Sequence, residues 1–271
     1  MALPRVIATD LDGTLLDGGG VVPDRARRAL NAASEAGVRV VIVTARPARA
    51  TDAIAAMFDC AAVVCANGAH TQLPREPVLT RALDRDTSGL VVEKLRSGLP
   101  DLGFGVETGT DFYHDLAYDE HLASWVPRFG VSGVLDDTDA LLEAASPVAK
   151  LIARSNTYAV QFMLESARES VGSLADVTYS GGHGLLEVSA AGVNKGSTLA
   201  MLCERWDVGR EEVVAFGDMP NDRSALTWAG SGYAMANGHP ELLDPGLGLR
   251  VAPPNGEDGV AQVVEELLAA G

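Results

Sequence analysis

The chain has 271 residues, enough for one large domain or two modest ones, and its 47% hydrophobic and 21% charged residues are typical of a soluble globular protein. The 21 Lys and Arg residues are outnumbered by 37 Asp and Glu, which gives a formal net charge of -16. Such a charge repels nucleic-acid backbones and anionic membrane surfaces, so we expect neither as a partner. A phosphorylated metabolite would also be repelled unless a local positive centre attracts it.

The cysteines, Cys60, Cys65 and Cys203, form no CxxC pair and are odd in number. This pattern argues against a disulfide framework or a structural zinc site, and we expect reduced thiols. The N-terminus reaches Asp10 before an apolar signal region can form, and no apolar run approaches the roughly 18 residues of a membrane span. We therefore expect a cytoplasmic protein.

The first elements form a strand, a helix and a second strand. Residues 5–9 are a short β-branched run that stops at acidic and glycine residues, as a buried parallel strand does when it enters a functional loop. Between Pro23 and Gly37, apolar residues at helical spacing predict a helix of about three to four turns. Residues 38–43 are apolar at five of six positions and predict a strand buried on both faces. The order implies a right-handed parallel crossover.

The same alternation recurs later in the chain. A helix is expected near 48–58, a strand near 61–65 and a turn at Asn67-Gly68. A helix near 195–206 is followed by a strand at 213–216. We assign the four predicted strands to one open, Rossmann-like α/β sheet.

The middle of the chain has a different composition and a different pattern of apolar residues. Between about 83 and 186, Gly and Pro are scattered and the predicted strands are shorter, with partial alternation at 150–154 and 160–164. This predicts an inserted α+β domain at 83–186 within a catalytic core formed by 1–82 and 187–271.

Polar residues follow the strands of the predicted core. Ligands of open parallel sheets bind outside the carboxyl ends of the strands, so these side chains are expected to converge. They are Asp10, Asp12, Thr44, Asn67, Asp218, Asn221 and Asp222. Converging carboxylates repel one another unless a cation lies among them, and oxygen ligands of this kind suit Mg²⁺. Lys195, which opens a helix, could add a second positive charge.

These residues resemble the four motifs of the haloacid-dehalogenase (HAD) superfamily. DLDGTL at 10–15 matches DxDGT, Thr44 matches the second motif, Lys195 the third, and GDMPND at 217–222 matches GDxxND. The long insert and the segments 185–188 and 192–196 are similar to the Cof-type subgroup with a type IIB cap. The resemblance implies an aspartyl-phosphate mechanism with Asp10 as nucleophile. It implies that Asp12 is the general acid and then the base.

The resemblance also implies a ligand set. Mg²⁺ would be held by the Asp10 carboxylate, the Asp12 backbone carbonyl and Asp218, with Asp222 as a supporting partner or a ligand through water. Phosphate would be bound by Thr44, Lys195, the Asn221 amide and the backbone N–H groups near Leu11 and Ala45.

Some positions leave alternatives open. The second motif of Cof-type relatives often reads Ser/Thr-Gly-Arg, whereas residues 44–47 here are TARP, without the glycine that would let the backbone approach phosphate. Asn67-Gly68 is either a simple tight turn or a substrate contact. Arg46 either adds positive charge at the site or forms a surface salt bridge.

Three functional hypotheses follow. The first is a capped phosphatase acting on a small soluble phosphomonoester, a sugar phosphate or a phosphorylated cofactor. The second is a phosphomutase with the same aspartyl-phosphate chemistry, and the third is a phospho-receiver or sensing module without turnover. The cap would select the leaving group, with Glu107, Asp111, His114 and Tyr118 as candidate contacts. The sequence gives no oligomeric state.

Overall fold

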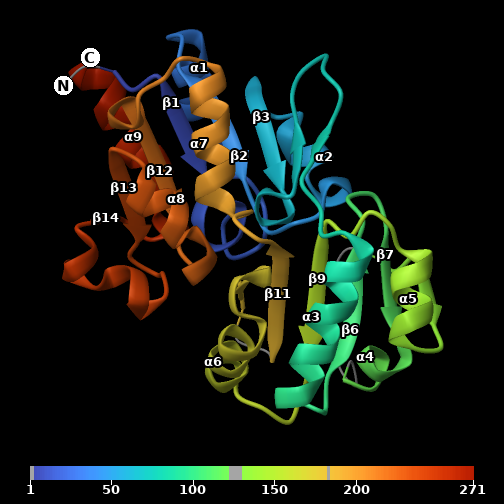
Figure 1. Ribbon diagram of the computed structural model, residues 1–271. Coiled ribbons are helices and arrows are strands. Elements are labelled where there is room, and N and C mark those ends of the chain that lie inside the picture. The colour runs from blue at the N-terminus through green and yellow to red at the C-terminus, as the bar shows by residue number, and fades with distance from the viewer. Residues whose placement is uncertain (1–2, 122–129, 182–183) are drawn as a thin grey trace. The chain divides into compact units, whose positions relative to one another are not determined.

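The computed structural model describes residues 3–121, 130–181 and 184–271, and the chain forms two compact units (Figure 1). Unit 1 comprises Met1–Ala45, Thr51–Val78 and Asn194–Gly271. Unit 2 comprises Arg46–Ala50 and Leu79–Val193. Among the described residues, no helix is both long and apolar enough to cross a bilayer.

Unit 1 is built on a mainly parallel sheet in the order β14-β13-β12-β1-β2-β3-β4. Its strands are β1 (Val6–Thr9), β2 (Arg39–Val43), β3 (Cys60–Cys65), β4 (His70–Gln72), β12 (Val213–Gly217), β13 (Ser231–Met235) and β14 (Arg250–Ala252). Only the β3–β4 pair is antiparallel among these pairs of the described strands. The four strands expected from the sequence are the adjacent set β12, β1, β2 and β3.

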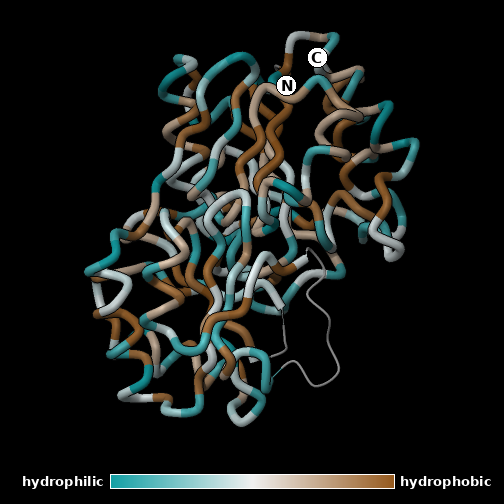
Figure 2. The backbone as a smooth tube through the Cα atoms, turned by 90° about the vertical axis from the view of Figure 1, so that its right-hand side faces the viewer, coloured by the Kyte–Doolittle hydropathy of each residue, from teal (hydrophilic) through white to brown (hydrophobic). Residues whose placement is uncertain are grey.

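Helices supply the rest of the core of unit 1. They are α1 (Asp24–Glu35), α2 (Asp52–Ala55), α7 (Lys195–Arg205), α8 (Arg223–Trp228) and α9 (Gly259–Ala270). Helix α1 packs against α9, and α7 packs against α8. The buried positions of α1, Ala26, Ala29, Leu30 and Ala33, are the ones whose spacing predicted the helix. Figure 2 shows hydrophobic stretches along the central strands and hydrophilic ones in the outer loops.

The segment 48–58 differs from the predicted helix. It contains a single turn, η2 (Ala48–Ala50), and the four-residue helix α2. No residue of α2 is buried, so α2 itself has no apolar face whose packing would extend it into a longer helix. Residues 46–50 also pack with unit 2, which separates the two short pieces.

Unit 2 is an α+β domain with a mixed sheet in the order β10-β11-β9-β6-β7-β8. The strands are β6 (Gly103–Glu107), β7 (Phe112–Asp115), β8 (Gly133–Leu135), β9 (Lys150–Arg154), β10 (Ala175–Thr178) and β11 (Leu185–Ala190). The helices are α3 (Arg85–Gly98), α4 (Leu116–Glu120), α5 (Thr138–Ala144) and α6 (Val160–Val171), and a two-residue strand, β5 (Leu79–Thr80), precedes them. Helix α3 contacts both α5 and α6.

One expected strand of this domain is a helix. Residues 160–164 begin α6, whose buried residues are Val160, Met163, Leu164, Ala167 and Val171. These positions recur at intervals of three and four, which is the helical period, and the five-residue window was too short to distinguish it from alternation.

The edges of the units fall a few residues from the expected ones. Strand β11 pairs with β9 and β10, so residues 187–190, which were expected in the catalytic core, lie in the sheet of unit 2. Residues 46–50, expected in the core, also group with unit 2. The proposed cap, 83–186, lies inside the longer segment of unit 2.

Candidate active site

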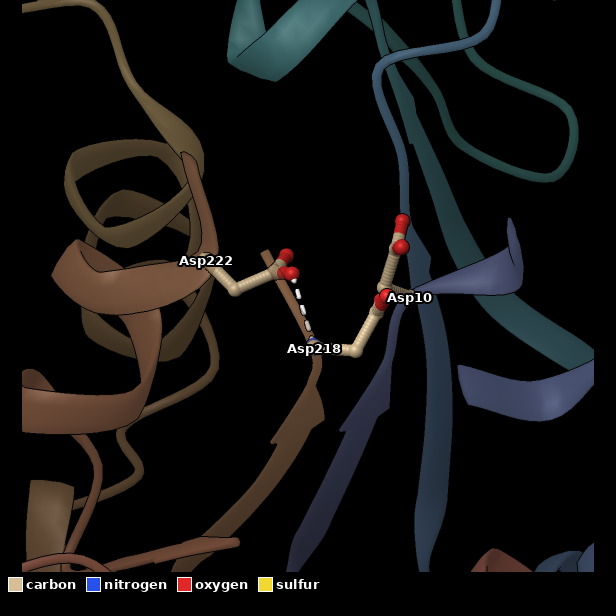
Figure 3. A group of neighbouring side chains, drawn as sticks. All are labelled: Asp10, Asp218 and Asp222. Atoms are coloured by element: carbon tan, nitrogen blue, oxygen red, sulfur yellow. Dashed lines mark hydrogen bonds between the residues drawn. The ribbon is translucent and has the colours of Figure 1, made fainter. Parts of the chain in front are cut away.

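The carboxyl ends of adjacent parallel strands bring the acidic residues of unit 1 together. Asp10 follows β1 and its backbone N–H donates to the Phe216 carbonyl at 3.1 Å, on the neighbouring strand β12. Asp218 follows β12 directly. One carboxylate oxygen from each of Asp10, Asp218 and Asp222 lies within 4.8 Å of the others, and all three residues are buried (Figure 3).

The turn at Leu11–Leu15 places the first motif against Asp218. Gly13 has a φ of +76°, and a Cβ atom there would lie 2.2 Å from Asp218 Oδ2. Thr14 Oγ1 donates to Asp218 Oδ1 at 2.8 Å. Glycine is therefore required both by the backbone conformation and by the close approach of the carboxylate. Asp12, in the same turn, is half-buried.

Lys195 is the positive centre of the cluster. It is the first residue of α7, and its Nζ lies 2.9 Å from Asp10 Oδ1 and 2.5 Å from Asp222 Oδ1. Its side chain is 1% exposed. The preceding Asn194 caps the helix, because its side-chain oxygen accepts from the Ser197 N–H at 2.9 Å. The helix start thus fixes the point from which the ammonium group reaches Asp10.

Asp222 supports both Lys195 and the loop after β12. Its Oδ2 accepts from the backbone N–H groups of Asp218 at 3.0 Å and Met219 at 2.9 Å, while Oδ1 accepts from Lys195. Both carboxylate oxygens are engaged within the protein. The arrangement fits a role in holding Asp218 and Lys195 in place.

Burial and mutual repulsion dominate the electrostatics of the carboxylates. Burial raises the pKa of Asp10, with Lys195 opposing and Asp222 and Asp218 adding to the rise. Burial, reinforced by Asp222, also raises the pKa of Asp218, to about 7. Burial disfavours the charged form of Lys195, but attraction to Asp10 and Asp222 outweighs it and raises the pKa of its ammonium group.

The residues fit a divalent cation. Three buried carboxylates face a single ammonium group, so the cluster keeps an excess of negative charge when all are ionised. The donors near Asp10 and Asp218 are oxygens, which Mg²⁺ prefers. A cation would favour the ionised forms that burial now opposes.

Apart from Lys195, the residues expected to bind phosphate follow the carboxyl ends of neighbouring strands. Thr44 follows β2, is 1% exposed, and its backbone N–H donates to the Val64 carbonyl at 2.8 Å. Leu11 is buried and Ala45 half-buried. Asn221 lies in the turn η6 (Pro220–Asp222), and its Nδ2 donates to Asn67 Oδ1 at 3.0 Å. Because β1, β2 and β12 are adjacent and parallel, these residues share one edge of the sheet.

Comparison with known proteins agrees with this arrangement. A family model described as haloacid dehalogenase-like hydrolase matches residues 7–264. The chain belongs to the haloacid dehalogenase-like hydrolase family. It is a HAD-type phosphatase of the Cof-type, IIB subgroup, with an α/β core sheet and a separate cap sheet.

Curated relatives of this HAD phosphatase match over nearly their whole length. The 5-amino-6-(5-phospho-D-ribitylamino)uracil phosphatase YitU of Bacillus subtilis is 27% identical, covering 98% of each chain. An HMP-PP phosphatase of Cronobacter sakazakii is 27% identical, over 89% of this chain and 87% of the relative. Among solved structures, SMU.1108c of Streptococcus mutans has a TM-score of 0.81 at 23% identity, covering 98% of this chain and 99% of that one. This last likeness shows the fold alone.

Sequence reasoning missed two residues outside the motifs of the HAD core, one that supports the first motif and one that supports the fourth. Asn237 Nδ2 donates to the Gly13 carbonyl at 2.8 Å, and its Oδ1 accepts from the Asn255 N–H at 2.8 Å. The His239 N–H donates to the Asp218 carbonyl at 2.7 Å. Asn237 lies 224 positions from Gly13, so no local pattern in the sequence could have indicated the contact.

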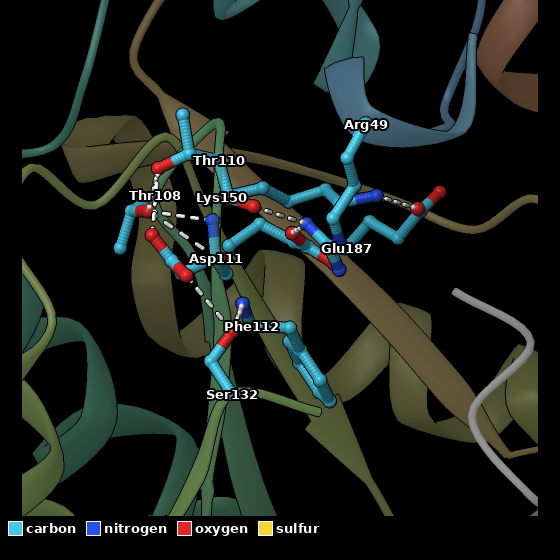
Figure 4. A network of polar contacts seen from close by, with 9 residues as sticks. Arg49, Thr108, Thr110, Asp111, Phe112, Ser132, Lys150 and Glu187 are labelled. Carbon is cyan, nitrogen blue, oxygen red and sulfur yellow. Dashed lines mark hydrogen bonds and ion pairs between the residues drawn. The ribbon is translucent and has the colours of Figure 1, made fainter. Parts of the chain in front are cut away.

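Two of the four candidate cap residues, Glu107 and Asp111, take part in polar contacts within unit 2, where Figure 4 shows the network around Asp111. Glu107 accepts from both terminal nitrogens of Arg49, at 2.6 and 3.0 Å. Lys150 Nζ donates to Glu187 Oε1 at 2.5 Å, and both residues are buried. Asp111 accepts from the hydroxyls of Thr110 and Ser132. His114 and Tyr118 are also buried, so most of the expected contacts have protein partners or lie within the packed domain.

Proposed function

We propose that this enzyme hydrolyses a small phosphomonoester, a sugar phosphate or a phosphorylated cofactor, through an aspartyl-phosphate on Asp10. The observation that supports it most strongly is the contact of Lys195 Nζ with Asp10 Oδ1, inside a cluster of three buried carboxylates. The two curated relatives named above are phosphatases of small phosphorylated molecules. Their names support a class of substrate for this chain and not an individual compound.

In the proposed first step, an Asp10 oxygen attacks phosphorus and the bond to the leaving oxygen breaks. Lys195 donates to Oδ1 of the same carboxylate and so holds its position. Asp12 gives its proton to the leaving oxygen, so the alcohol departs neutral. Lys195 and the groups at Thr44, Ala45 and Asn221 bind the phosphoryl oxygens, where negative charge accumulates.

In the second step, water attacks the phosphorus of the acyl-phosphate. Asp12, now ionised, accepts the proton of the water, and the Asp10 carboxylate is released with inorganic phosphate. Mg²⁺, held by Asp10, the Asp12 carbonyl and Asp218, would neutralise charge on the carboxylate and the phosphoryl group. The half-buried position of Asp12 leaves it accessible to a leaving group and to water.

A phosphate-release screen over many phosphorylated metabolites tests the proposal. With Mg²⁺, the wild type should release phosphate from a subset of small phosphomonoesters, and Asp10→Asn should release none above background. Equal release by both proteins, or none by either, would reject it. Formation of an isomeric phosphate with little inorganic phosphate would instead establish the phosphomutase alternative. A long-lived phosphorylated Asp10 without turnover would establish the receiver alternative.

A further inference from the structure

Asn67 is buried in the active-site core and makes the one side-chain hydrogen bond that the Asn221 amide forms among the described residues. Asn67 is 2% exposed and Asn221 is 7% exposed. Asn221 Nδ2 donates to Asn67 Oδ1 at 3.0 Å. Asn221 Oδ1 is also buried and has no hydrogen-bond partner among the residues that the structure describes. The amide is therefore oriented from one side, by Asn67.

Orientation matters for this group because the two ends of an amide have opposite hydrogen-bonding character. The terminal torsion of Asn is broad and nearly two-fold, so without a partner the oxygen and nitrogen exchange places at little cost. An N–H can donate to a phosphoryl oxygen, whereas a carbonyl oxygen would repel it. Asn67 Oδ1 accepts one Nδ2 hydrogen and leaves the second available to donate.

The loop that carries Asn67 is held by its neighbours. Ala66, Asn67 and Gly68 all have positive φ, at 50°, 56° and 109°. The Asn67 N–H donates to the Thr44 carbonyl at 3.1 Å, and Thr198 Oγ1 donates to the Gly68 carbonyl at 3.0 Å. A Cβ atom at Gly68 would lie 2.6 Å from the Asn194 carbonyl, so the loop packs directly on the start of α7.

We propose that Asn67 is a positioning residue of the phosphatase: its carbonyl oxygen fixes the Asn221 amide in the orientation that donates to the phosphoryl group. The loop at 66–68 ties this amide to Thr44 and to the helix that presents Lys195. Asn67 itself acts through Asn221 and not on the substrate. The inference rests on the proposed function, since it assigns Asn221 to phosphate binding.

Two variants separate the side chain from the backbone. Asn67→Gly removes the oxygen and keeps a residue that accepts positive φ, whereas Asn67→Asp keeps an oxygen in the same place. Asp207→Gly is the matched control, because Asp207 is an exposed residue of the same unit with a φ of +53°. It reproduces the entropic cost of a new glycine away from the site.

With p-nitrophenyl phosphate and Mg²⁺, Asn67→Gly should lower kcat at least tenfold, while its Tm stays close to that of Asp207→Gly. Adding Asn67→Gly to Asn221→Ala should cause no further loss of kcat, because the amide to be positioned is already gone. Wild-type activity in Asn67→Gly, or losses that multiply in the double variant, would overturn the inference.

The side-chain amide resonances of Asn221 give a readout that needs no turnover. In metal-free protein, Asn67→Gly should shift the Asn221 Nδ2 proton upfield and speed its exchange with water, and Asn67→Asp should not. Unchanged resonances in Asn67→Gly would overturn the inference. If the wild type releases no phosphate, the proposed function fails, and the resonances still decide whether Asn67 orients Asn221.

Discussion

The environment of Lys195 is the clearest example of how single residues determine this site. One buried ammonium group faces Asp10 and Asp222, and each member of the group would be costly to bury alone. We expect Lys195→Met to destabilise unit 1 by about 3–5 kcal/mol in EDTA, the usual cost of removing one partner of a buried pair. Urea unfolding of the wild type and of Lys195→Met in EDTA measures this difference in the free energy of unfolding.

The exposed pair between Arg223 and Glu241 offers a control for this substitution. Its side chains are 52% and 40% exposed, so Arg223→Met should cost less than about 1 kcal/mol. Combining Lys195→Met with Asp222→Asn should restore part of the lost stability, since one uncompensated charge is removed. Equal effects of the Lys195 and Arg223 substitutions would contradict this account of the cluster.

His70 gives a pH-dependent prediction. Burial lowers the pKa of His70, and its Nδ1 has no hydrogen-bond partner among the described residues. As pH falls below about 6.5, the imidazole takes up a proton in the unfolded chain but not in the folded one, so its contribution to stability is present above that pH and lost below it. The Tm advantage of the wild type over His70→Gln should therefore shrink from pH 7.5 to pH 5.5. A constant difference would show that His70 does not titrate differently on unfolding.

The sequence predicted many of these residues because motifs are local. Gly13 and Thr14 lie within six residues of Asp10, and Asn221 and Asp222 lie within four of Asp218. Asn237 supports Gly13 of the first motif and His239 supports Asp218, and both lie in the connection between β13 and β14. That proximity is created by the tertiary fold and leaves no local signal.

At the level of elements, the close packing of β6 against α4 yields a test of the cap. A Cβ atom at Gly103 would lie 2.1 Å from the Tyr118 backbone nitrogen, whereas one at Gly89, on α3, would have nothing within 4 Å. Gly103→Ala should destabilise unit 2 by at least about 1–3 kcal/mol. Gly89→Ala should stabilise it by up to about 1 kcal/mol, because alanine favours the helix. The measurement is urea unfolding of both variants. A change in the free energy of unfolding with the same sign for both would contradict the packing of β6 against α4.

The helices and strands that consist of a clear apolar run were predicted more accurately than the others. Strands β1, β2, β3 and β12 are buried β-branched or apolar runs and were expected close to their observed bounds. Strand β13 (Ser231–Met235) contains no β-branched residue and was not predicted. The start of α6 was interpreted as a strand because five residues do not distinguish a period of 3.6 from alternation.

For the whole molecule, the sequence predicted the fold class, since strand–helix alternation on both sides of a long insert leaves few alternatives to an α/β core with an inserted domain. The bounds of the insert were harder to predict from the sequence. Residues 46–50 group with unit 2 through packing that includes the ion pair of Arg49 with Glu107. That pair joins residues 58 positions apart, and no composition change marks it.

From the net charge of -16 and the acidic cluster, we expect the stability of the protein to depend on cations. Mg²⁺ at about 100 times its dissociation constant should stabilise the folded state by about 2.7 kcal/mol, as any ligand specific to that state does. Thermal unfolding should show the increase in the wild type and not in Asp218→Asn, with NaCl of matched ionic strength as the control. An equal increase in both proteins would indicate general screening of charge.

Trapping of the covalent intermediate tests the central claim most directly. Borohydride is added while the enzyme turns over a substrate from which it releases phosphate, and it should reduce an aspartyl-phosphate to homoserine. Peptide mass spectrometry then identifies the position of the homoserine. Homoserine at residue 10 in the wild type, and nowhere in Asp10→Asn, is the result we predict. Homoserine at another aspartate, or turnover in Asp10→Asn, would contradict the assignment of Asp10 as the nucleophile.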